Sequence, residues 1–437
     1  MTKNGRKILI KGGRILDPSQ NLDRALDLLI EGDRIQDLKP NIPAPVKTTE
    51  LEVWEAKGLW VLPGLIDMHV HLREPGRETD ETIASGTRAA ASGGVTSVVS
   101  MPNTEPPIDS ATLIRFVLEK AKKEAVVNVF PSGCVTKGQK GEELAEMGLM
   151  AEAGAIAFTD DGKPVMNAQV MRRALEYSKS LGFPVLDHCE DAHLSGQGVM
   201  NEGVVSSRMG VRGIPTESET LMALRDISLA ELTGGRLHIA HVSCAGTVEA
   251  VRQAKRRGVR VTAETCPHYF ALTEESLVSF NANFKMNPPL RRDSDVEAVR
   301  EGLRDGTLDA IATDHAPHSP SRKEMGLEAA PFGVIGLETL LPLTLTTLVH
   351  SKVLTPLEMV RCVSTHPAKL LGLKMKGGLR VGMDADITLV DPNREKILTD
   401  RFESKSKNSP FVGWKLKGFP VGTIVGGKVV YKDGMLV

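Results

Sequence analysis

Apolar and polar positions follow one pattern at the two ends of the chain and another in its middle. Near the N-terminus, apolar residues alternate between Gly and Asp turns in KILIKGGRILD, DLLIEGDRIQDL and LEVWEAKGLWVLPG. Near the C-terminus, ADITLVDP and GTIVGGKVVYKDG repeat this pattern. Alternation between turn residues is typical of β-strands. We therefore predict β-structure at both ends of the chain.

In the middle, short apolar runs alternate with helical stretches such as SATLIRFVLEKAKKEA and TVEAVRQAKRRG. Eight candidate strands lie at 65–71, 95–102, 126–134, 154–160, 184–189, 236–242, 259–266 and 308–314. This order predicts parallel βα units, and eight such units indicate an α/β fold of the TIM-type (β/α)8 barrel class. An open doubly wound sheet is the alternative. Its dinucleotide-binding form has little support, because no GxGxxG motif follows a first strand.

The two β-rich ends are expected to pair with each other, because a barrel leaves the chain termini close together. We predict a small composite β-domain from residues 1–62 and 373–437. Residues 63–372 are expected to form the barrel, which carries the catalytic site.

The composition narrows the classes of function. Apolar residues make up 41% and charged residues 25% of the 437 residues, which is typical of soluble globular proteins. A formal net charge of −1 argues against nucleic acid or an anionic membrane as a partner. We find no apolar run of membrane-spanning length and no signal peptide. The five cysteines lack CxxC spacing and are expected to be reduced thiols in the cytoplasm.

The most informative segment for chemistry is PGLIDMHVHLREPG at residues 63–76. His69 and His71 are two positions apart at the end of an apolar run, so they share one face of a strand and can bind a divalent metal. Arg73 follows on that face and can bind a carboxylate through two hydrogen bonds. An isolated H-x-H pair is more often structural, so its interpretation depends on partner ligands elsewhere.

Such partners follow the other predicted strands. They are Asn103 in MPNT, Asp160 and Asp161 in FTDDG, His188 in DHCED, His241 in HIAHVS, and Asp314, His315 and His318 in ATDHAPH. In a barrel these residues meet at the C-terminal face. Four histidines and two aspartates exceed the needs of one metal, but suit two divalent ions roughly 3.5–4 Å apart, bridged by a carboxylate and a hydroxide.

Imidazole and carboxylate ligands suit zinc best, with manganese or cobalt as alternatives. A metal pair lowers the pKa of a bridging water and polarises a carbonyl oxygen. The predicted chemistry is therefore hydrolysis of an amide or related bond, or the reverse reaction.

Seven motifs together carry a family resemblance. PGLIDMHVHLREPG, SMPNT, AFTDDG, DHCED, HIAHVS, KMNPPLR and ATDHAPH, in this order, resemble the amidohydrolase superfamily and, more narrowly, the bacterial class I dihydroorotases. The resemblance runs from the GGRILDP opening to the GKVVYKDG end.

This resemblance implies roles for individual residues and two Zn²⁺ ions per chain. It makes His69 and His71 ligands of the first metal, Asp161 the bridge, His188 and His241 ligands of the second metal, and Asp314 the last ligand and catalytic acid/base. It makes His71, Arg73, Asn103, Asn287 and His318 substrate-binding residues, with Phe332 and Gly333 ending a loop over the substrate.

The residue expected to bridge the two metals distinguishes this chain from related families. Hydantoinases, dihydropyrimidinases and allantoinases bridge their metals with a carboxylated lysine, whereas GAIAFTDDG has no lysine and offers Asp161. The resemblance thus implies reversible cyclisation of N-carbamoyl-L-aspartate to (S)-dihydroorotate and water, in de novo pyrimidine biosynthesis. Another cyclic amidohydrolase is less consistent with the missing lysine and with Arg73. A non-catalytic, dihydroorotase-like scaffold for aspartate transcarbamoylase is less consistent with the complete ligand set. A homodimer and an added complex with aspartate transcarbamoylase both stay open.

Supporting roles or positions are also expected for several residues near the predicted site. Asp160 and Asp161 face opposite ways in an extended chain, so Asp160 is expected in a turn or a supporting role. His238 lies three positions before His241 and is expected to face the helix layer, and His268 is expected near the site in a supporting role. The stretch from Pro317 to Gly333 is long and rich in Pro, Gly and charge, so we predict a mobile lid.

Overall fold

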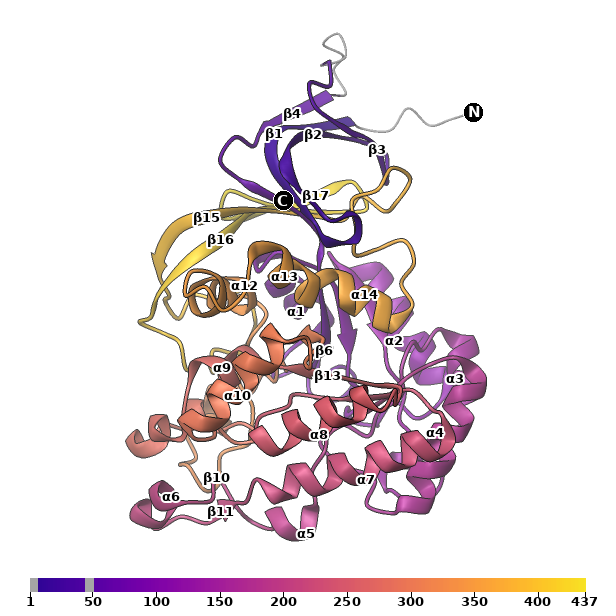
Figure 1. Ribbon diagram of the computed structural model, residues 1–437, viewed down its shortest axis with the longest axis vertical. Coiled ribbons are helices and arrows are strands. Elements are labelled where there is room, and N and C mark those ends of the chain that lie inside the picture. Colours follow the sequence, from indigo (N-terminus) through magenta and orange to yellow (C-terminus); the bar gives the residue numbers. More distant parts are fainter. Residues whose placement is uncertain (1–6, 44–50) are drawn as a thin grey trace.

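A single β-sheet contains strands from both ends of the chain. The computed structural model describes residues 7–43 and 51–437, and Figure 1 shows this sheet at one end of the molecule, above a larger α/β part. Its strand order is β18-β17-β16-β15-β5-β1-β2-β3, with β4 paired to β1. The strands are β1 (Lys7–Asp17), β2 (Leu22–Glu31), β3 (Arg34–Lys39), β4 (Leu51–Glu55), β5 (Trp60–Pro63), β15 (Ile387–Ile397), β16 (Lys415–Val425), β17 (Lys428–Lys432) and β18 (Met435–Leu436). Residues 1–6 and 44–50 of the predicted composite domain lie outside the described residues.

The two chain ends join where β5 pairs antiparallel with β15, with Leu62 opposite Thr388. Apolar side chains from both ends pack into one buried cluster that includes Ile8, Ile10, Leu389 and Ile424. The β-structure predicted at both ends is therefore confirmed.

Seven parallel strands make up two further sheets. The strands of the first sheet, in spatial order, are β6 (Leu65–Val70), β7 (Val95–Ser100) and β8 (Asn128–Pro131). The second sheet contains, in spatial order, β14 (Ala310–Ile311), β13 (Val261–Thr265), β12 (Leu237–Ile239) and β9 (Val185–Asp187). Isolated parallel bridges connect their edges, from Val70 to His315 on one side and through Phe158 to Gly133 and Val185 on the other.

The predicted strand at 154–160 is not a regular strand. Only Phe158 bridges its neighbours there. The chain leaves extended pairing near Asp160, whose carboxylate instead accepts the backbone N–H groups of Val135 and Thr136 at 2.9 and 3.1 Å. The other seven predicted strands are present, although shorter than expected.

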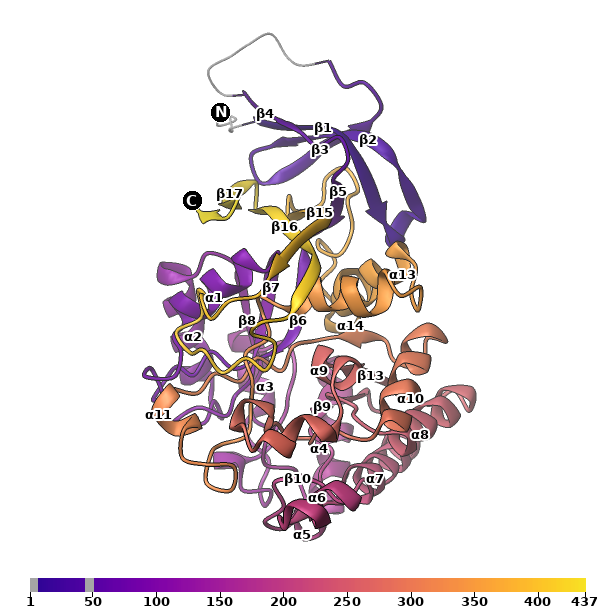
Figure 2. The ribbon, with the colours of Figure 1, turned by 90° about the vertical axis from the view of Figure 1, so that its left-hand side faces the viewer.

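Helices lie between these strands in sequence and cover them in space (Figures 1 and 2). The longer helices are α1 (Ile83–Ser92), α2 (Ala111–Glu124), α3 (Met147–Ala153), α4 (Ala168–Leu181), α7 (Glu217–Thr233), α8 (Ala245–Arg256) and α10 (Asp293–Arg304). The short elements are α5 (Ala192–Ser195), β10 (Met200–Asn201), α6 (Val204–Met209), β11 (Gly213–Ile214), α9 (Pro267–Ala271), α11 (Pro320–Lys323), α12 (Leu340–Thr344), α13 (Pro356–Val360) and α14 (His366–Leu371).

Helix α4 illustrates why the sequence forms these helices. The Asn167 side chain caps its start by accepting the N–H groups of Gln169 and Val170. The side chains of Met171, Ala174, Leu175 and Ser178 are buried at the three- and four-residue spacing of one helical face. Gly182 ends the helix with a φ of 81°, a conformation that glycine adopts without strain.

A separate apolar cluster fills the space between the parallel strands. It contains Ile66 and Met68 from β6, Val99 from β7, Leu186 from β9 and Ala310 from β14. Beyond these apolar residues, toward the carboxyl ends of the strands, the buried side chains become imidazoles and carboxylates. The core thus ends where the candidate site begins.

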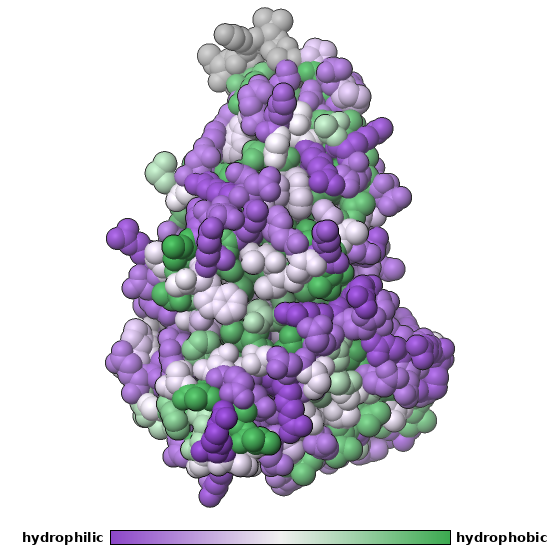
Figure 3. All heavy atoms as spheres, turned by 60° about the vertical axis from the view of Figure 1, so that its left-hand side comes forward, coloured by the Kyte–Doolittle hydropathy of each residue, from purple (hydrophilic) through white to green (hydrophobic). Residues whose placement is uncertain are grey.

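Three further features concern the helices, the cysteines and the surface of the protein. Among the described residues, no helix is long and apolar enough to span a lipid bilayer. All five cysteines are buried free thiols. The face shown in Figure 3 is covered mostly by polar side chains, with small apolar areas between them.

Candidate functional site

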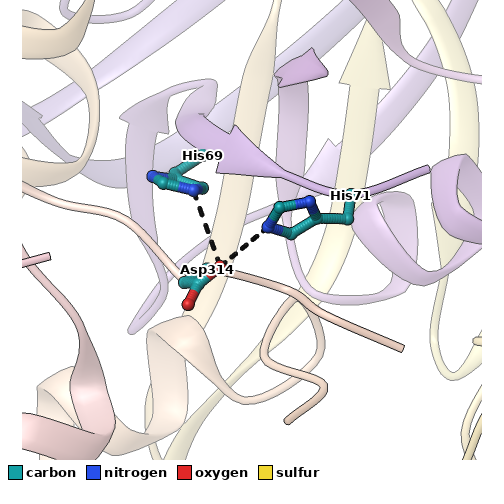
Figure 4. Close-up of side chains that lie close together, drawn as sticks. All are labelled: His69, His71 and Asp314. Atoms are coloured by element: carbon teal, nitrogen blue, oxygen red, sulfur yellow. Dashed lines mark hydrogen bonds and ion pairs between the residues drawn. The ribbon is translucent and has the colours of Figure 1, made fainter. Parts of the chain in front are cut away.

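The first pair of histidines lies at the end of β6, next to the loop that follows β14. The Nε2 atoms of His69 and His71 lie 3.5 and 2.9 Å from Oδ1 of Asp314, and all three side chains are buried. Figure 4 shows the two rings directed at this carboxylate. Asp314 has a φ of 46°, so its backbone is strained where the side chain enters the site.

The second pair combines His188, just after β9, with His241, just after β12. His188 Nδ1 and His241 Nε2 are 2.8 Å apart. Asp161 lies between the two pairs. Its Oδ1 is 3.3 Å from His69 Nε2 and 3.7 Å from both nitrogens of the second pair, while its Oδ2 is 3.5 Å from His71 Nε2. A carboxylate in this position can bridge two metal ions.

The residues present fit a divalent metal centre. Ligand atoms of His69, His71 and Asp314 lie within 4.8 Å of one another, and so do those of His69, Asp161 and His241. His69 Nε2 is buried at this meeting point, with no hydrogen-bond partner among the described residues. A buried polar atom without a partner is unfavourable, and coordination of a cation satisfies it.

Glutamates that sequence reasoning missed orient two of the ligands. His69 donates from Nδ1 to Glu264 at 3.0 Å, and His188 donates from Nε2 to Glu190 at 3.0 Å. These bonds direct His69 Nε2 and His188 Nδ1 toward the centre, where His188 Nδ1 meets His241 Nε2, and they match the support that metal-ligating histidines receive through their other ring nitrogen. Glu190 stands within DHCED, and Glu264 is an acidic residue inside a buried strand. Both signals were visible in the sequence.

Electrostatics in the cluster favour a cation. Burial opposes ionisation of Asp161, yet the surrounding imidazoles hold its pKa well below the usual range. Burial likewise opposes protonation of His188, but hydrogen bonds with Asp161 and Glu190 raise its pKa to about 10. The carboxylates therefore attract positive charge, and metal binding would displace protons from the imidazoles.

The expectation for His238 is wrong. Its Nδ1 lies 2.9 Å from Thr262 Oγ1, and its Nε2 lies 3.4 Å from Glu264 Oε2, so the ring lies against the interior carboxylate that also supports His69. The alternation rule fails because β12 ends at Ile239. At His241 the backbone has a φ of 36°, which turns that side chain to the rim independently of strand parity.

Three other residues with secondary expectations, Asp160, His315 and His268, are not among the side chains whose ligand atoms meet in the cluster. Asp160 bonds to backbone amides of the neighbouring turn, as expected for a supporting role. His315 lies 3.3 Å from Glu81 and accepts the backbone N–H of Gly336. His268 is buried in ring contact with Tyr269, and burial lowers its pKa to about 4.

Cationic side chains form the opposite end of the pocket. Arg73 is 4% exposed and donates from Nε to the carbonyl of Pro317 at 3.2 Å. Burial and the nearby Arg77 lower the pKa of Arg73 to about 9, so it stays charged at neutral pH. Asn103 lines the pocket beside the histidine and aspartate cluster, because it accepts from His71 Nδ1 at 2.8 Å and donates to Asp161 at 3.3 Å.

His318 has both ring nitrogens bonded within the protein. Nε2 is 2.7 Å from the carbonyl oxygen of Phe332, which can only accept, so this nitrogen carries the proton. Nδ1 accepts from Arg77 at 3.2 Å. Burial and Arg73 lower the pKa of His318 to about 2, so the ring is neutral. Arg77 and its partner Asp80, 2.6 Å away, were not predicted from the sequence.

A cavity of about 220 Å³ connects the two ends. Its lining contains every predicted site residue except His69: His71, Arg73, Asn103, Asp161, His188, His241, Asn287, Asp314, His318, Phe332 and Gly333, together with Arg77, Gly162 and Ala316. Among the described residues, no lysine lines it.

Two lysines hold the segment predicted as a lid. Lys285 donates to the carbonyls of Leu327 and Ala330 at 2.8 and 2.7 Å. Lys323 donates to the carbonyls of Pro331 and Gly333 at 3.0 Å each. In this conformation the segment brings Phe332 and Gly333 to the cavity wall.

Comparisons with known proteins agree with this geometry. Residues 58–247 match a family described as dihydro-orotase-like, and residues 201–431 match the amidohydrolase family. The chain is 53% identical to a dihydroorotase of Geobacter sp. (strain M21), covering 98% of this chain and 100% of that protein. It is 54% identical to a dihydroorotase of Pelotomaculum thermopropionicum, with the same coverage.

Solved structures of similar fold include enzymes named for other activities. L-hydantoinase (dihydropyrimidinase) from Arthrobacter aurescens has a TM-score of 0.87 at 26% identity, covering 98% of this chain and 97% of that chain. Dihydropyrimidinase from Brevibacillus agri NCHU1002 has a TM-score of 0.85 at 26% identity, covering 99% and 96%.

Proposed function

The chain belongs to the dihydroorotase family within the amidohydrolases, and from this premise we propose how its residues share the work. It is a hydrolase that carries out the dihydroorotase reaction, the reversible cyclisation of N-carbamoyl-L-aspartate to dihydroorotate and water, in pyrimidine biosynthesis. The family is metal-dependent, and the chain has buried His/Asp groups suited to a metal. We assign it to the bacterial class I type, acting on the (S)-enantiomer.

We further propose that two zinc ions bind at the rim. His69 and His71 hold the first, His188 and His241 the second, Asp161 bridges them, and Asp314 completes the set. When bound, the metal pair supplies an activated water and polarises the amide carbonyl. The close approach of all six side chains to one another supports this assignment.

The chain's own residues move the proton and orient the substrate. In hydrolysis, an Asp314 carboxylate oxygen accepts the proton of the attacking water and delivers it to the leaving ring nitrogen. Arg73, Asn103 and Asn287 orient the substrate through its polar groups, with Arg73 paired to the carboxylate. His318, Phe332 and Gly333 close the far wall, and the protein excludes water that would compete with cyclisation.

One observation favours dihydroorotate over the hydantoinase substrates. The cavity contains a buried cation, Arg73, and no lysine among its described lining residues. A hydantoin or dihydrouracil ring carries no carboxylate to pair with Arg73, whereas dihydroorotate does. Asp161 occupies the place between the histidine pairs, so no carboxylated lysine is needed there.

We also propose that the parallel strands form one closed (β/α)8 barrel over residues 63–372, and that residues 1–62 and 373–437 form the composite β-domain. The bridges at Val70–His315 and Phe158–Val185 support closure. A homodimer and a complex with aspartate transcarbamoylase are the two assemblies that the sequence leaves open. Both assemblies stay predictions.

Metal analysis combined with substrate assays tests this proposal. We expect about two zinc ions per chain, hydrolysis of dihydroorotate without added bicarbonate, and no turnover of hydantoin or dihydrouracil. Asp161→Ala should lose metal from one or both sites. Turnover of dihydrouracil in place of dihydroorotate, or activation by bicarbonate, would contradict the substrate and the aspartate bridge respectively.

A further inference from the structure

The connection between β15 and β16 has an unusual burial pattern. Between residues 402 and 408 buried and exposed side chains alternate strictly, as they do in a strand. The buried members are Phe402, Ser404, Ser406 and Asn408, so three of the four are polar. Polar side chains are buried at a cost unless they form hydrogen bonds, and each of these does. We call residues 402–409 the strap. Figure 2 shows this connection descending from the sheet beside α1.

The first half of the strap binds the segment that follows Arg73. The hydroxyl of Ser404 donates to the Glu81 carboxylate, which also accepts the backbone N–H of Lys405 at 3.1 Å. The hydroxyl of Ser406 donates to the backbone carbonyl of Asp80 at 2.6 Å. Asp80 in turn accepts a hydrogen bond from Arg77, whose guanidinium lines the cavity.

Asn408 lies at the end of the strap. Its carboxamide forms hydrogen bonds with both ends of the segment from Pro317 to Gly333 and with the residue before it. Its Oδ1 accepts the backbone N–H of His318 at 3.2 Å. Its Nδ2 donates to the carbonyls of Ala316 and Gly333 at 3.1 and 3.0 Å. Its own carbonyl accepts the N–H of Ile335 at 3.1 Å. Asn408 is 3% exposed and is absent from the cavity lining, so it acts only through these neighbours.

We propose that Asn408 is a positioning residue that sets the shape of the substrate end of the pocket. It holds the two ends of the segment 317–333, near His318 and at Gly333, against each other. The hydrogen bond from His318 Nε2 to Phe332 lies in the same wall of the pocket. The inference rests on the proposed function, because it assumes that this wall faces the substrate. Among the residues that the structure describes, no hydrogen bond joins the strap directly to a proposed metal ligand.

An asparagine is required here for a chemical reason. The position needs one acceptor and two donors in one plane, which a carboxamide supplies. Asn408→Asp keeps the size and the acceptor, but places a second oxygen against two carbonyl oxygens. Asn408→Ala removes all three side-chain bonds. Ser409→Ala is the matched control, since Ser409 is the next residue, is equally buried, and bonds only within its own segment, to the N–H of Phe411.

Steady-state kinetics and metal analysis of these variants test the proposal. We expect Asn408→Ala and Asn408→Asp to raise KM for dihydroorotate about tenfold or more, the size of one lost buried hydrogen bond, with kcat per bound metal nearly unchanged. Ser409→Ala should keep the parent KM. In a double variant, Asn408→Ala should add little to the KM of His318→Ala, because both changes disrupt the same wall.

Amide hydrogen exchange gives a readout that does not depend on substrate. The His318 amide should exchange faster in Asn408→Ala and keep its protection in Asn408→Asp and Ser409→Ala. Unchanged KM in folded, metal-bound Asn408 variants, or fully additive effects with His318→Ala, would overturn the positioning role. If the parent protein does not hydrolyse dihydroorotate at all, the proposed function fails instead, and unaltered exchange at His318 would still reject the loop contact. If Asn408→Ala does not fold, Asn408→Asp still carries the KM test, including its comparison with His318→Ala.

Discussion

The two ends of the pocket differ in the kind of structure that holds their side chains in place. The metal end consists of side chains at or just after strand ends, and neighbouring glutamates such as Glu264 hold their rings. The substrate end is built on loops, and backbone carbonyls and the distant strap hold its side chains. The first arrangement follows mainly from the order of the strands. The second follows from contacts made by loops, such as that of Asn408 with Gly333.

This difference indicates a division of tasks. Imidazoles and carboxylates suited to a metal make up the metal end, whereas Arg73 and Arg77 make the substrate end cationic. A fixed cation at one end and a metal centre at the other would orient a substrate that carries a carboxylate at one side and a reacting amide at the other. Changes at the metal end should therefore affect kcat or metal content, and changes at the substrate end should affect KM.

The largest effect is expected for Asp314→Asn. An amide cannot accept the proton of the attacking water, so kcat should fall by at least about 10²-fold. Stopped assays on protein of known metal content measure this. Near-normal kcat with metals bound would show that Asp314 is not the acid/base.

Arg73→Met tests the opposite end. Loss of a charged hydrogen-bonding partner should raise KM for both dihydroorotate and N-carbamoyl-L-aspartate by about 10- to 150-fold, or roughly 1.5–3 kcal/mol. Metal content should match that of the parent protein. A fall in kcat at constant KM would contradict the distinction between the two ends.

Glu264→Gln probes the support behind the metal ligands. Replacing the carboxylate that accepts from His69 Nδ1 should weaken metal affinity about 10- to 100-fold, while KM measured at saturating metal stays near normal. Competition with a chelator measures the affinity. Arg73→Met provides the control, because it should leave this affinity unchanged.

The last prediction concerns how the equilibrium between dihydroorotate and N-carbamoyl-L-aspartate depends on pH. It tests the two ends of the pocket through the charges of the substrates. In the proposed binding mode both substrates present a carboxylate to Arg73, but only the open form has a second one, which would lie at the metal end. Cyclisation consumes a proton, so the equilibrium should shift toward the ring about tenfold per pH unit of acidification, or ~1.4 kcal/mol. Equilibrium ratios and initial rates from about pH 6 to 9 measure this. Identical pH profiles for the two directions would contradict the proton accounting.

The sequence predicted most of the metal end because strand ends are readable from periodicity. His69 and His71 follow from a two-residue spacing, and the carboxyl ends of parallel strands meet at one rim. The same rule failed for His238, because the backbone leaves β12 before His241 and parity no longer applies. It also overestimated the strand at 154–160, where Asp160 bonds to a turn.

The support of the substrate end could not be read from the sequence. Arg77 and Asp80 look like ordinary charged loop residues, and only the fold brings them against His318. The strap shows period-two burial with polar residues inside, so its buried positions do not stand out as apolar residues in the sequence. Backbone carbonyls, which accept from Arg73 and Asn408, carry no sequence signal at all.

The position of the strap in the chain also gives the two ends different histories during translation. A nascent chain that has passed Asp314 contains all six proposed metal ligands, whereas Asn408 is synthesised later, between β15 and β16. The proposed metal ligands are therefore all synthesised before the residue that is proposed to position the substrate end. For the same reason, a chain cleaved after β15 would keep all six of these residues but lose the strap.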